Sequence, residues 1–382
     1  MILPKSGVMS QNYQPLNEKL ILYATDLSSY SAKVRSYLLK KNIAFEERIP
    51  SSKTYKNLII PRTGGKFIPV IQKPNNTLIQ DSSTIIESLE KSHPQHSIYP
   101  TTPKQKLAAL LLEVYADEWL QIPAMHFRWN YPKSNHEFLI QEYGKILKPN
   151  WPKLVQHGAA KKDIKKYEKK LEALGINTQT IPKIEKSFMQ LLLLLNNYFK
   201  KNKYLFGSRP SIADFSLFGP MFAFFFRDPF AGKIMKLKAP YVNIWINRMS
   251  SKRSSIGGFF SEDNIPKTVN KILHNMSLEQ IPVVMETARQ LDKWDAKSNY
   301  RDLPRTLGTH RFNLHGVVSK RAIYSYLLWM WQKPHQFYQS LNDDVKSRLN
   351  PWLLEIGMLG ALNKPINTRL KKINSHLLIA AK

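Results

Sequence analysis

The sequence predicts an α/β domain followed by a region that is all α. Residues 19–100 show strand and helix patterns in the order βαβ and then ββα. After Pro103, apolar residues recur at helical spacing for most of the chain, beginning with Leu107, Leu110, Leu111, Val114 and Tyr115. The 382 residues are 43% hydrophobic with only 15 Gly, which suits two or three globular domains and excludes a low-complexity chain.

Local patterns predict the elements of the α/β domain. Strands are predicted at 20–23, 44–49, 67–72 and 78–80. The turn-rich segment 25–29 precedes a helix that carries Val34, Leu38 and Leu39, and a second helix is predicted from residue 81 to residue 89. Pro69 lies inside the third predicted strand, where a proline requires an edge position or a cis peptide bond. This order of elements resembles the thioredoxin fold.

Composition and pattern divide the chain into four segments. We expect a flexible N-terminal segment at 1–18, a thioredoxin-like domain at 19–100, a helical domain with a Lys-rich insertion at 101–258, and a mostly helical extension at 259–382. In the extension, helical patterns lie at 278–294 and at 321–331.

Ser211 and Asp214 match a helix capping box in which Asp replaces the usual Glu or Gln. The Ser211 hydroxyl is expected to accept from the Asp214 amide, and the Asp214 carboxylate to accept from the Ser211 amide. Replacing either residue should cost about 1 kcal/mol of stability. The role that this pattern indicates is structural.

The chain carries a net charge of +29, which raises the question of anionic partners. Residues 143–203 contribute 14 Lys against four acidic residues. Such a run is most often a solvated helix face, and binding to polyanions is the alternative. We found no nucleic-acid-binding motif, so specific nucleic-acid binding is not expected.

Several classes of chemistry are excluded or not expected. The chain has no Cys, which removes disulfides, thiolate metal sites and a protein thiol nucleophile. His310 and His315 lack a nearby carboxylate and make a poor metal pair, so we expect no metal. Neither a secretory signal nor an apolar run of membrane-spanning length is evident, so a cytoplasmic location is expected.

Four separated motifs, in order along the chain, resemble the glutathione transferase family. They are the loop-to-helix segment 28–35, the strand 66–70, the pair Asp81 and Ser82, and the capping box 211–214. The resemblance covers roughly residues 19–250. It implies a thioredoxin-like domain that binds glutathione and a helical second domain, and it leaves about a third of the chain unexplained.

The start of the first helix can stabilise a thiolate without any appeal to the family. Free amides and a partial positive charge at a helix N-terminus favour an anion, and a hydroxyl beside them adds a hydrogen bond. By resemblance, Ser28 occupies the position of the family's activating Ser or Cys. Tyr23 and Tyr30 are the alternative activating residues, and Ser29, a further alternative in the same loop, is expected to bind glutathione. The competing interpretation is that Ser28 only caps the helix.

By resemblance, the residues around Pro69 bind the cysteinyl part of glutathione. Pro69 corresponds to the family's cis-proline, which exposes the backbone of Ile68 to the ligand. Phe67 stands where the family often has Gln or Lys, so Lys66 is expected to serve instead. An ordinary edge proline is the alternative.

By resemblance, Asp81 and Ser82 hold the γ-glutamyl end of glutathione. The Ser82 hydroxyl and the helix amides suit its carboxylate, and the Asp81 carboxylate suits its ammonium group. The alternative is that Asp81 is a simple helix cap.

The resemblance implies a transferase that conjugates the glutathione thiolate to a hydrophobic electrophile. Trp119, His126 and Trp129 are candidate walls of the second-substrate pocket, with a role in the core as the alternative. Family members are commonly dimers, so a homodimer is expected. The alternative function is a non-catalytic binding protein that uses its basic surface and C-terminal extension for a macromolecular partner.

Overall fold

The computed structural model of the protein describes residues 19–168, 170–252, 257–297 and 302–380. Within these ranges the first domain contains a four-stranded sheet of β1 (Leu20–Tyr23), β2 (Phe45–Arg48), β3 (Val70–Gln72) and β4 (Leu78–Gln80). The strand order is β2-β1-β3-β4. β2 runs parallel to β1, β3 is antiparallel to β1, and β4 is antiparallel to β3. This arrangement confirms the predicted thioredoxin-like fold.

The third strand is shorter than predicted. The sequence pattern suggested a strand at 67–72, but β3 begins at Val70, which pairs with Tyr23 of β1. The peptide bond between Ile68 and Pro69 is cis. Pro69 has no N–H group to donate to a neighbouring strand, so regular pairing starts after it.

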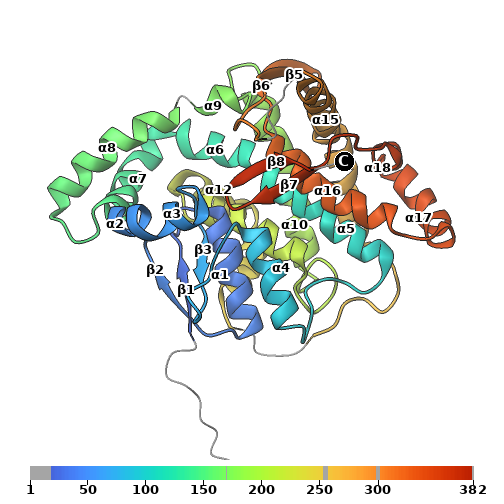
Figure 1. The fold of residues 1–382 in the computed structure, drawn as a ribbon, viewed down its shortest axis with the longest axis horizontal. Coiled ribbons are helices and arrows are strands. Elements are labelled where there is room, and N and C mark those ends of the chain that lie inside the picture. The colour runs from blue at the N-terminus through green and yellow to red at the C-terminus, as the bar shows by residue number, and fades with distance from the viewer. Residues whose placement is uncertain (1–18, 169, 253–256, 298–301, 381–382) are drawn as a thin grey trace, which may run out of the picture.

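Helices cover both faces of the sheet (Figure 1). α1 (Ser29–Lys41) and α4 (Ser82–Ser92) pack on the face that carries Leu22 and Ile71, both fully buried. The opposite face carries Tyr23 and Val70, which pack against Ile59. Ile59 belongs to a short helical stretch made of α2 (Ser52–Thr54), the π-helical turn η1 (Tyr55–Ile59) and α3 (Ile60–Thr63).

The helical domain follows α4. Its elements are α5 (Pro103–Val114), the π-helical turn η2 (Tyr115–Trp119), α6 (Gln121–Trp129), α7 (Pro132–Leu147), α8 (Lys153–Glu168), α9 (Lys170–Ala173), α10 (Ile181–Phe199), α11 (Ile212–Pro220), the π-helical turn η3 (Met221–Phe226), α12 (Pro229–Lys238) and α13 (Pro240–Ser250). α11 packs directly on α1. Gly219 permits this close approach, because a Cβ there would lie 2.6 Å from the Ser29 carbonyl oxygen.

The capping-box residues lie at the start of α11. The Asp214 carboxylate accepts hydrogen bonds from the Ser211 N–H, the Ser211 hydroxyl and the Leu205 N–H, at 2.9, 2.9 and 3.0 Å. Ser211 and Asp214 are both fully buried. The box therefore ties the preceding loop to the helix that supports α1.

The C-terminal extension is mostly helical, as predicted, but it also contains two β-hairpins. Its helices are α14 (Lys267–Glu279), α15 (Ile281–Asp295), α16 (Ser325–Gln339), α17 (Asp343–Glu355) and α18 (Leu359–Asn363). The hairpins are β5 (Thr309–Leu314) with β6 (Val317–Ala322), and β7 (Leu370–Ile373) with β8 (His376–Ile379). The predicted helix at 321–331 therefore begins only at Ser325, and the one predicted at 278–294 is interrupted at Gln280.

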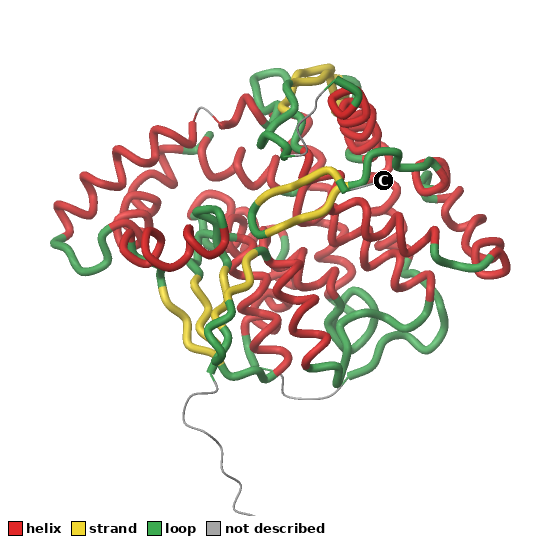
Figure 2. The backbone as a smooth tube through the Cα atoms, viewed as in Figure 1, coloured by secondary structure: helices red, strands yellow, loops and turns green. Residues whose placement is uncertain are grey.

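The extension lies against the first two domains and does not form a separate body. α16 packs on α5, and the hairpin of β7 and β8 lies over the first domain near α3 and α4 (Figures 1 and 2). The Ser375 N–H donates to the Thr63 carbonyl oxygen at 2.9 Å and anchors the tip of this hairpin. Within the described residues, no helix combines the length and apolar composition needed to cross a membrane.

Candidate functional site

The loops that carry the predicted site meet at one edge of the sheet. Strand register places Tyr23, Val70 and Gln80 side by side on β1, β3 and β4. The segment leading into α1, the bend at Pro69 and the start of α4 therefore lie at the same edge. A direct contact joins two of them, because the Asp81 N–H donates to the Pro69 carbonyl oxygen at 3.3 Å.

Ser28 is the N-cap of α1. Its hydroxyl oxygen accepts a hydrogen bond from the Ser31 N–H at 3.2 Å, while its own proton remains available as a donor. Ser29 is buried, and its hydroxyl accepts from the Gln121 side-chain amide at 3.2 Å. The first turn of α1 supplies free N–H groups beside these hydroxyls.

The two tyrosines near this loop have other partners. The Tyr23 hydroxyl donates to the Gln72 side-chain oxygen at 3.0 Å, on the sheet face opposite α1. The Tyr30 hydroxyl donates to the Asp117 carbonyl oxygen at 3.0 Å. Burial and the nearby carboxylates of Glu118 and Asp117 raise the pKa of Tyr30 well above its usual value. Among the three candidate activating residues, Ser28 therefore has the most accessible donor.

The bend before β3 leaves the backbone of Ile68 free. The structure has no hydrogen bond between the Ile68 N–H or C=O and any described residue. Phe67 is 48% exposed and its carbonyl oxygen accepts from the Gln80 side-chain amide at 2.9 Å. The exposed Lys66 lies with its ammonium 5.0 Å from the centre of the Tyr55 ring. Ile68 is thus the residue whose backbone can pair with a peptide-like ligand.

Asp81 and Ser82 begin α4. Asp81 is the N-cap, and its carboxylate accepts from the N–H and the hydroxyl of Thr84, each at 3.0 Å. Its φ of +89° is rare for a residue with a side chain, which marks a backbone position fixed by its surroundings. Ser82 is buried at the first helical position.

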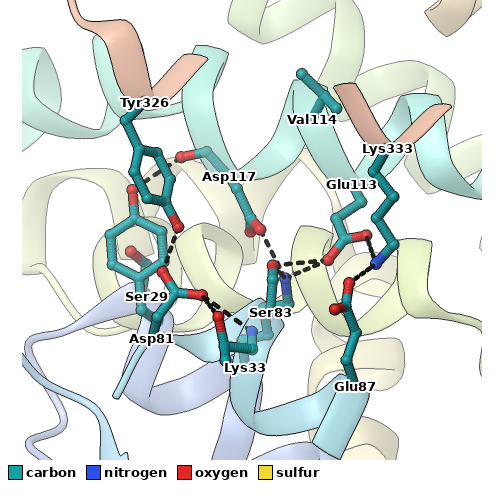
Figure 3. A network of polar contacts seen from close by, with 12 residues as sticks. Ser29, Lys33, Asp81, Ser83, Glu87, Glu113, Val114, Asp117, Tyr326 and Lys333 are labelled. Carbon is teal, nitrogen blue, oxygen red and sulfur yellow. Dashed lines mark hydrogen bonds and ion pairs between the residues drawn. The ribbon is translucent and has the colours of Figure 1, made fainter. Parts of the chain in front are cut away.

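The C-terminal extension reaches Asp81 from two directions. Tyr326 of α16 donates a hydrogen bond to Asp81 Oδ2, as Figure 3 shows. The ammonium nitrogen of Lys372 on β7 lies 3.7 Å from the same oxygen, 3.5 Å from the Gln80 carbonyl oxygen and 3.4 Å from the Thr84 hydroxyl. The Trp329 ring centre lies 5.3 Å from this ammonium. Lys372 therefore occupies a small cage for a cation.

A buried ionic network lies beside these loops. Lys33 of α1 is fully buried, and its ammonium lies 2.6 Å from Asp117, 2.9 Å from Glu113 and 3.1 Å from the Ser83 hydroxyl. Lys333 of α16 bridges the other Glu113 oxygen at 3.0 Å and Glu87 at 2.7 Å (Figure 3). The network joins all three regions of the chain.

The pKa values of this network follow from burial and pairing. Burial alone would lower the pKa of Lys33, but the carboxylates of Asp117 and Glu113 outweigh it and raise that pKa. Burial raises the pKa of Asp117 to about 6 despite Lys33. The pKa of Glu113 instead falls to about 2, because two ammonium groups overcome its burial.

Comparison with family models identifies two regions of the chain. Residues 22–97 match the model of the glutathione S-transferase N-terminal domain, and residues 178–248 match that of the C-terminal domain. These two domains belong to the glutathione S-transferase family. No curated protein matches the sequence.

Solved structures similar to this chain include glutathione S-transferases. A β-etherase from Sphingobium sp. strain SYK-6 is 19% identical, with 62% of this chain and 97% of that one covered and a TM-score of 0.41. A glutathione transferase from Phanerochaete chrysosporium is 17% identical, over 61% and 96%, with a TM-score of 0.42. A glutathione S-transferase from Methylobacillus flagellatus, solved with glutathione bound, is 19% identical over 62% and 97%, with a TM-score of 0.37.

The residues expected to form a second-substrate pocket are buried and are not brought together. The Trp119 indole donates to Glu279 at 2.8 Å, and its ring borders a cavity of about 20 Å³. His126 pairs with Glu185 at 2.9 Å, and burial lowers its pKa. Trp129 packs in a separate cluster, with its ring stacked 5.3 Å from that of Tyr167.

The sequence reasoning did not identify the ionic network. Glu113 and Asp117 stand four residues apart in a helical run of apolar residues, a spacing that puts both carboxylates on one side. Two acids on an apolar face imply a buried cation, and Lys33 lies on the buried side of α1. Tyr326, Lys333 and Lys372 gave no comparable local signal. In the described residues, no group of three His, Asp or Glu side chains is placed to hold a metal ion.

Proposed function

We propose that this chain is a glutathione-dependent transferase that conjugates the glutathione thiolate to an electrophilic small molecule. The observation that carries the proposal is the hydrogen bond from the Asp81 N–H to the Pro69 carbonyl oxygen. This contact fixes the free backbone of Ile68 beside a carboxylate at the N-terminus of α4. A peptide with a free ammonium and a free carboxylate at one end can pair its backbone with Ile68, its ammonium with the Asp81 carboxylate and its carboxylate with the N-terminus of α4.

In the proposed reaction, the sulfur lies at the start of α1. The helix N-terminus and the Ser28 hydroxyl lower the pKa of the thiol, whose proton leaves to solvent. The thiolate attacks the electrophilic carbon and forms a C–S bond, while the leaving group departs with its bonding electrons. Ser28 stabilises the sulfur anion and forms no covalent bond itself.

The ligand's ammonium group has to replace Lys372. Both are cations that would use Asp81, and the Asp81 and Lys372 side chains are only 13% and 10% exposed. Binding therefore requires the β7–β8 hairpin to move or Lys372 to change its rotamer. Because Lys372 competes with the ligand's ammonium group for Asp81, we expect glutathione to bind more weakly than it would to the same site without Lys372.

Calorimetric titration with glutathione and with an S-alkyl glutathione tests the proposal. We expect the wild type to bind both and Asp81→Asn to bind at least tenfold more weakly, since asparagine keeps the helix cap and tolerates the positive φ but loses the charge. Asp344→Asn, at a 77% exposed position on α17, is the matched control and should bind like the wild type. Turnover of a nitro-activated aryl chloride then measures transfer.

Absence of binding in the wild type would overturn the proposal. The observation that favours a second candidate is the same pair of contacts from Tyr326 and Lys372 to Asp81. If the wild type does not bind glutathione, these two contacts close the site permanently, and the chain is a non-catalytic binding protein. Its partner would then be sought with the basic helices and the extension.

A further inference from the structure

A pocket of about 150 Å³ lies away from Asp81, where the end of α1 meets the loop before α11 and the end of α13. Its lining includes five cationic side chains, namely Lys40, Lys41, Lys203, Arg209 and Arg248. None of the described residues that line it is acidic. A concentration of positive charge in a confined space favours an anionic ligand.

Lys40 is the unusual member of this group. Its residue surface is only 5% exposed, yet its ammonium has no hydrogen bond or ion pair with any other described residue. Burial, together with the positive charge of Arg248, lowers the pKa of Lys40 to about 8. The ammonium nitrogen is not itself fully enclosed, and Lys40 lines the pocket, where an anion can pair with it.

The end of α1 does not supply that partner. Lys40 lies in the last turn, where a cation benefits from the helix dipole. However, no hydrogen bond joins the Lys40 ammonium to a carbonyl group of this turn, in which the Leu38 carbonyl accepts from the Asn42 and Ile43 N–H groups. The helix end therefore leaves the ammonium group without a hydrogen-bond acceptor.

The neighbouring cations are held in place and retain free donors. Lys41 pairs with the buried Glu90 at 2.8 Å, which neutralises it. The Arg248 guanidinium donates to the Lys203 carbonyl oxygen at 2.7 Å, and the Arg209 Nε donates to the Gly257 carbonyl oxygen at 2.8 Å. Each guanidinium has five N–H groups, so each keeps donors beyond this single contact. Two arginines and two lysines without an ion pair to a described residue, Lys40 and the exposed Lys203, thus surround the pocket.

We propose that this pocket binds a phosphate group. The fork of an arginine matches the oxygens of phosphate, and a lysine ammonium adds a third charged donor. A volume of about 150 Å³ suits a phosphate group with a small substituent. The site is independent of the proposed glutathione site, and its ligand is either free phosphate or the phosphate of a small metabolite.

Thermal unfolding of the full chain, at constant ionic strength set with chloride, tests the site. Wild-type Tm should rise saturably with inorganic phosphate, because a ligand that binds only the native state stabilises it. Lys40→Met should weaken phosphate binding at least tenfold, as read from the midpoint of the Tm increase and from calorimetric titration. Lys238→Met, an exposed lysine in the last turn of α12, should behave like the wild type.

The stability of Lys40→Met in chloride shows whether Lys40 is needed for the fold or only for binding phosphate. In chloride alone, Lys40→Met should be at least as stable as the wild type, because it removes a partly desolvated charge that Arg248 repels. If that variant fails to fold, Arg248→Gln tests the opposite wall with the same titration. The proposal is wrong if phosphate and chloride shift Tm equally in the wild type, or if the folded variant retains the wild-type affinity.

Two further readouts identify the ligand and the residue. Titration with glycerol 3-phosphate beside inorganic phosphate distinguishes the sources: at least tenfold tighter binding of glycerol 3-phosphate points to a phosphorylated metabolite, and equal binding points to phosphate itself. Amine labelling followed by mass spectrometry should modify Lys40 at mildly alkaline pH, and saturating phosphate should reduce that labelling at least fivefold. Labelling that phosphate leaves unchanged would contradict the proposal.

Discussion

The ammonium nitrogen of Lys33 lies 2.6 Å from a carboxylate oxygen of Asp117, and these two side chains are 1% and 4% exposed. The pair joins α1 of the first domain to the π-helical turn η2 of the second. Glu113 and Ser83 complete the shell around the ammonium. The N-terminus of α1, where Ser28 lies, is therefore held by a charge pair and not only by apolar packing.

Replacing Lys33 with methionine should destabilise the protein strongly. Methionine keeps most of the volume but leaves the buried Asp117 without its cation and leaves Glu113 paired with Lys333 alone. Removing one partner of a buried ion pair costs about 3–5 kcal/mol. Urea unfolding of the two proteins measures the loss.

Lys91→Met is the matched control, since Lys91 is an exposed lysine in the last turn of α4. It should change the free energy of unfolding by less than about 0.5 kcal/mol. The double variant Lys33→Met with Asp117→Asn should recover part of the loss. A Lys33→Met protein as stable as the wild type would contradict the role assigned to the pair.

Lys372 should weaken the binding of ligands that carry an ammonium group. We expect Lys372→Met to bind glutathione about tenfold more tightly than the wild type, because a charged hydrogen-bond partner is worth about 1.5–3 kcal/mol. Calorimetric titration with glutathione and with its analogue lacking the γ-glutamyl amino group measures the effect. The preference for glutathione over that analogue should rise in the variant.

Lys371→Met provides the control for this comparison, because Lys371 is the exposed neighbour of Lys372 on the same strand. Successive side chains of a strand point to opposite faces, so this variant should bind like the wild type. Hydrogen exchange of the 370–379 hairpin should increase when glutathione is added. Weaker binding by Lys372→Met would mean that Lys372 contacts the ligand and does not compete with it.

Ser28 should have two separable roles. Ser28→Ala removes the acceptor for the Ser31 N–H and should cost about 1 kcal/mol of stability. It also removes the hydroxyl donor and should raise the pKa of bound glutathione's thiol, which the pH dependence of thiolate absorbance measures. Ser28→Gly removes the hydroxyl, adds no charge and keeps a residue that caps helices well, so most of the stability should return while the thiol pKa stays high. A thiol pKa that is equal in all three proteins would assign thiolate stabilisation to α1 alone.

The sequence predicted those parts of the site that depend on residues close together in the chain. The bend at Pro69 and the helix start at Asp81 each leave a local pattern, because proline geometry and helix capping act over a few residues. The contact from Tyr326 to Asp81 spans 245 positions, and no local rule connects such residues. Only the packing of α16 on α5 brings them together.

The two β-hairpins of the extension were not predicted from the sequence, for a different reason. In β6, half-buried and exposed residues alternate only from Val317 to Lys320, and the last two residues are both buried. A turn signal was present in Asn313 to Gly316, where His315 and Gly316 have φ of +48° and +86° and the Asn313 side chain accepts from the Gly316 N–H. Aromatic residues follow at helical spacing, and this pattern favoured a helix. The predicted helix therefore began at Arg321, and the turn signal before it was not used.

The pH dependence of stability should reveal the buried Asp214. Burial raises its pKa to about 6 in the folded protein, while an unfolded aspartate titrates at about 3.9. Between these values the folded state holds a proton that the unfolded state has released. The contribution of Asp214 is therefore full below about pH 4 and is lost as the pH rises through about 6, a decrease of about 3 kcal/mol.

Asp214→Asn removes this titration but keeps an acceptor for only one of the two amides, because the Leu205 N–H donates to Oδ1 and the Ser211 N–H donates to Oδ2. The difference in free energy of unfolding between the wild type and this variant should thus fall by about 3 kcal/mol from pH 4 to pH 7 and stay constant above pH 7. Urea unfolding at each pH measures it, with the exposed Asp344→Asn as the reference whose difference stays flat. A difference that grows with pH would mean that the hydrogen bonds from Ser211 and Leu205 outweigh burial and keep the carboxylate ionised.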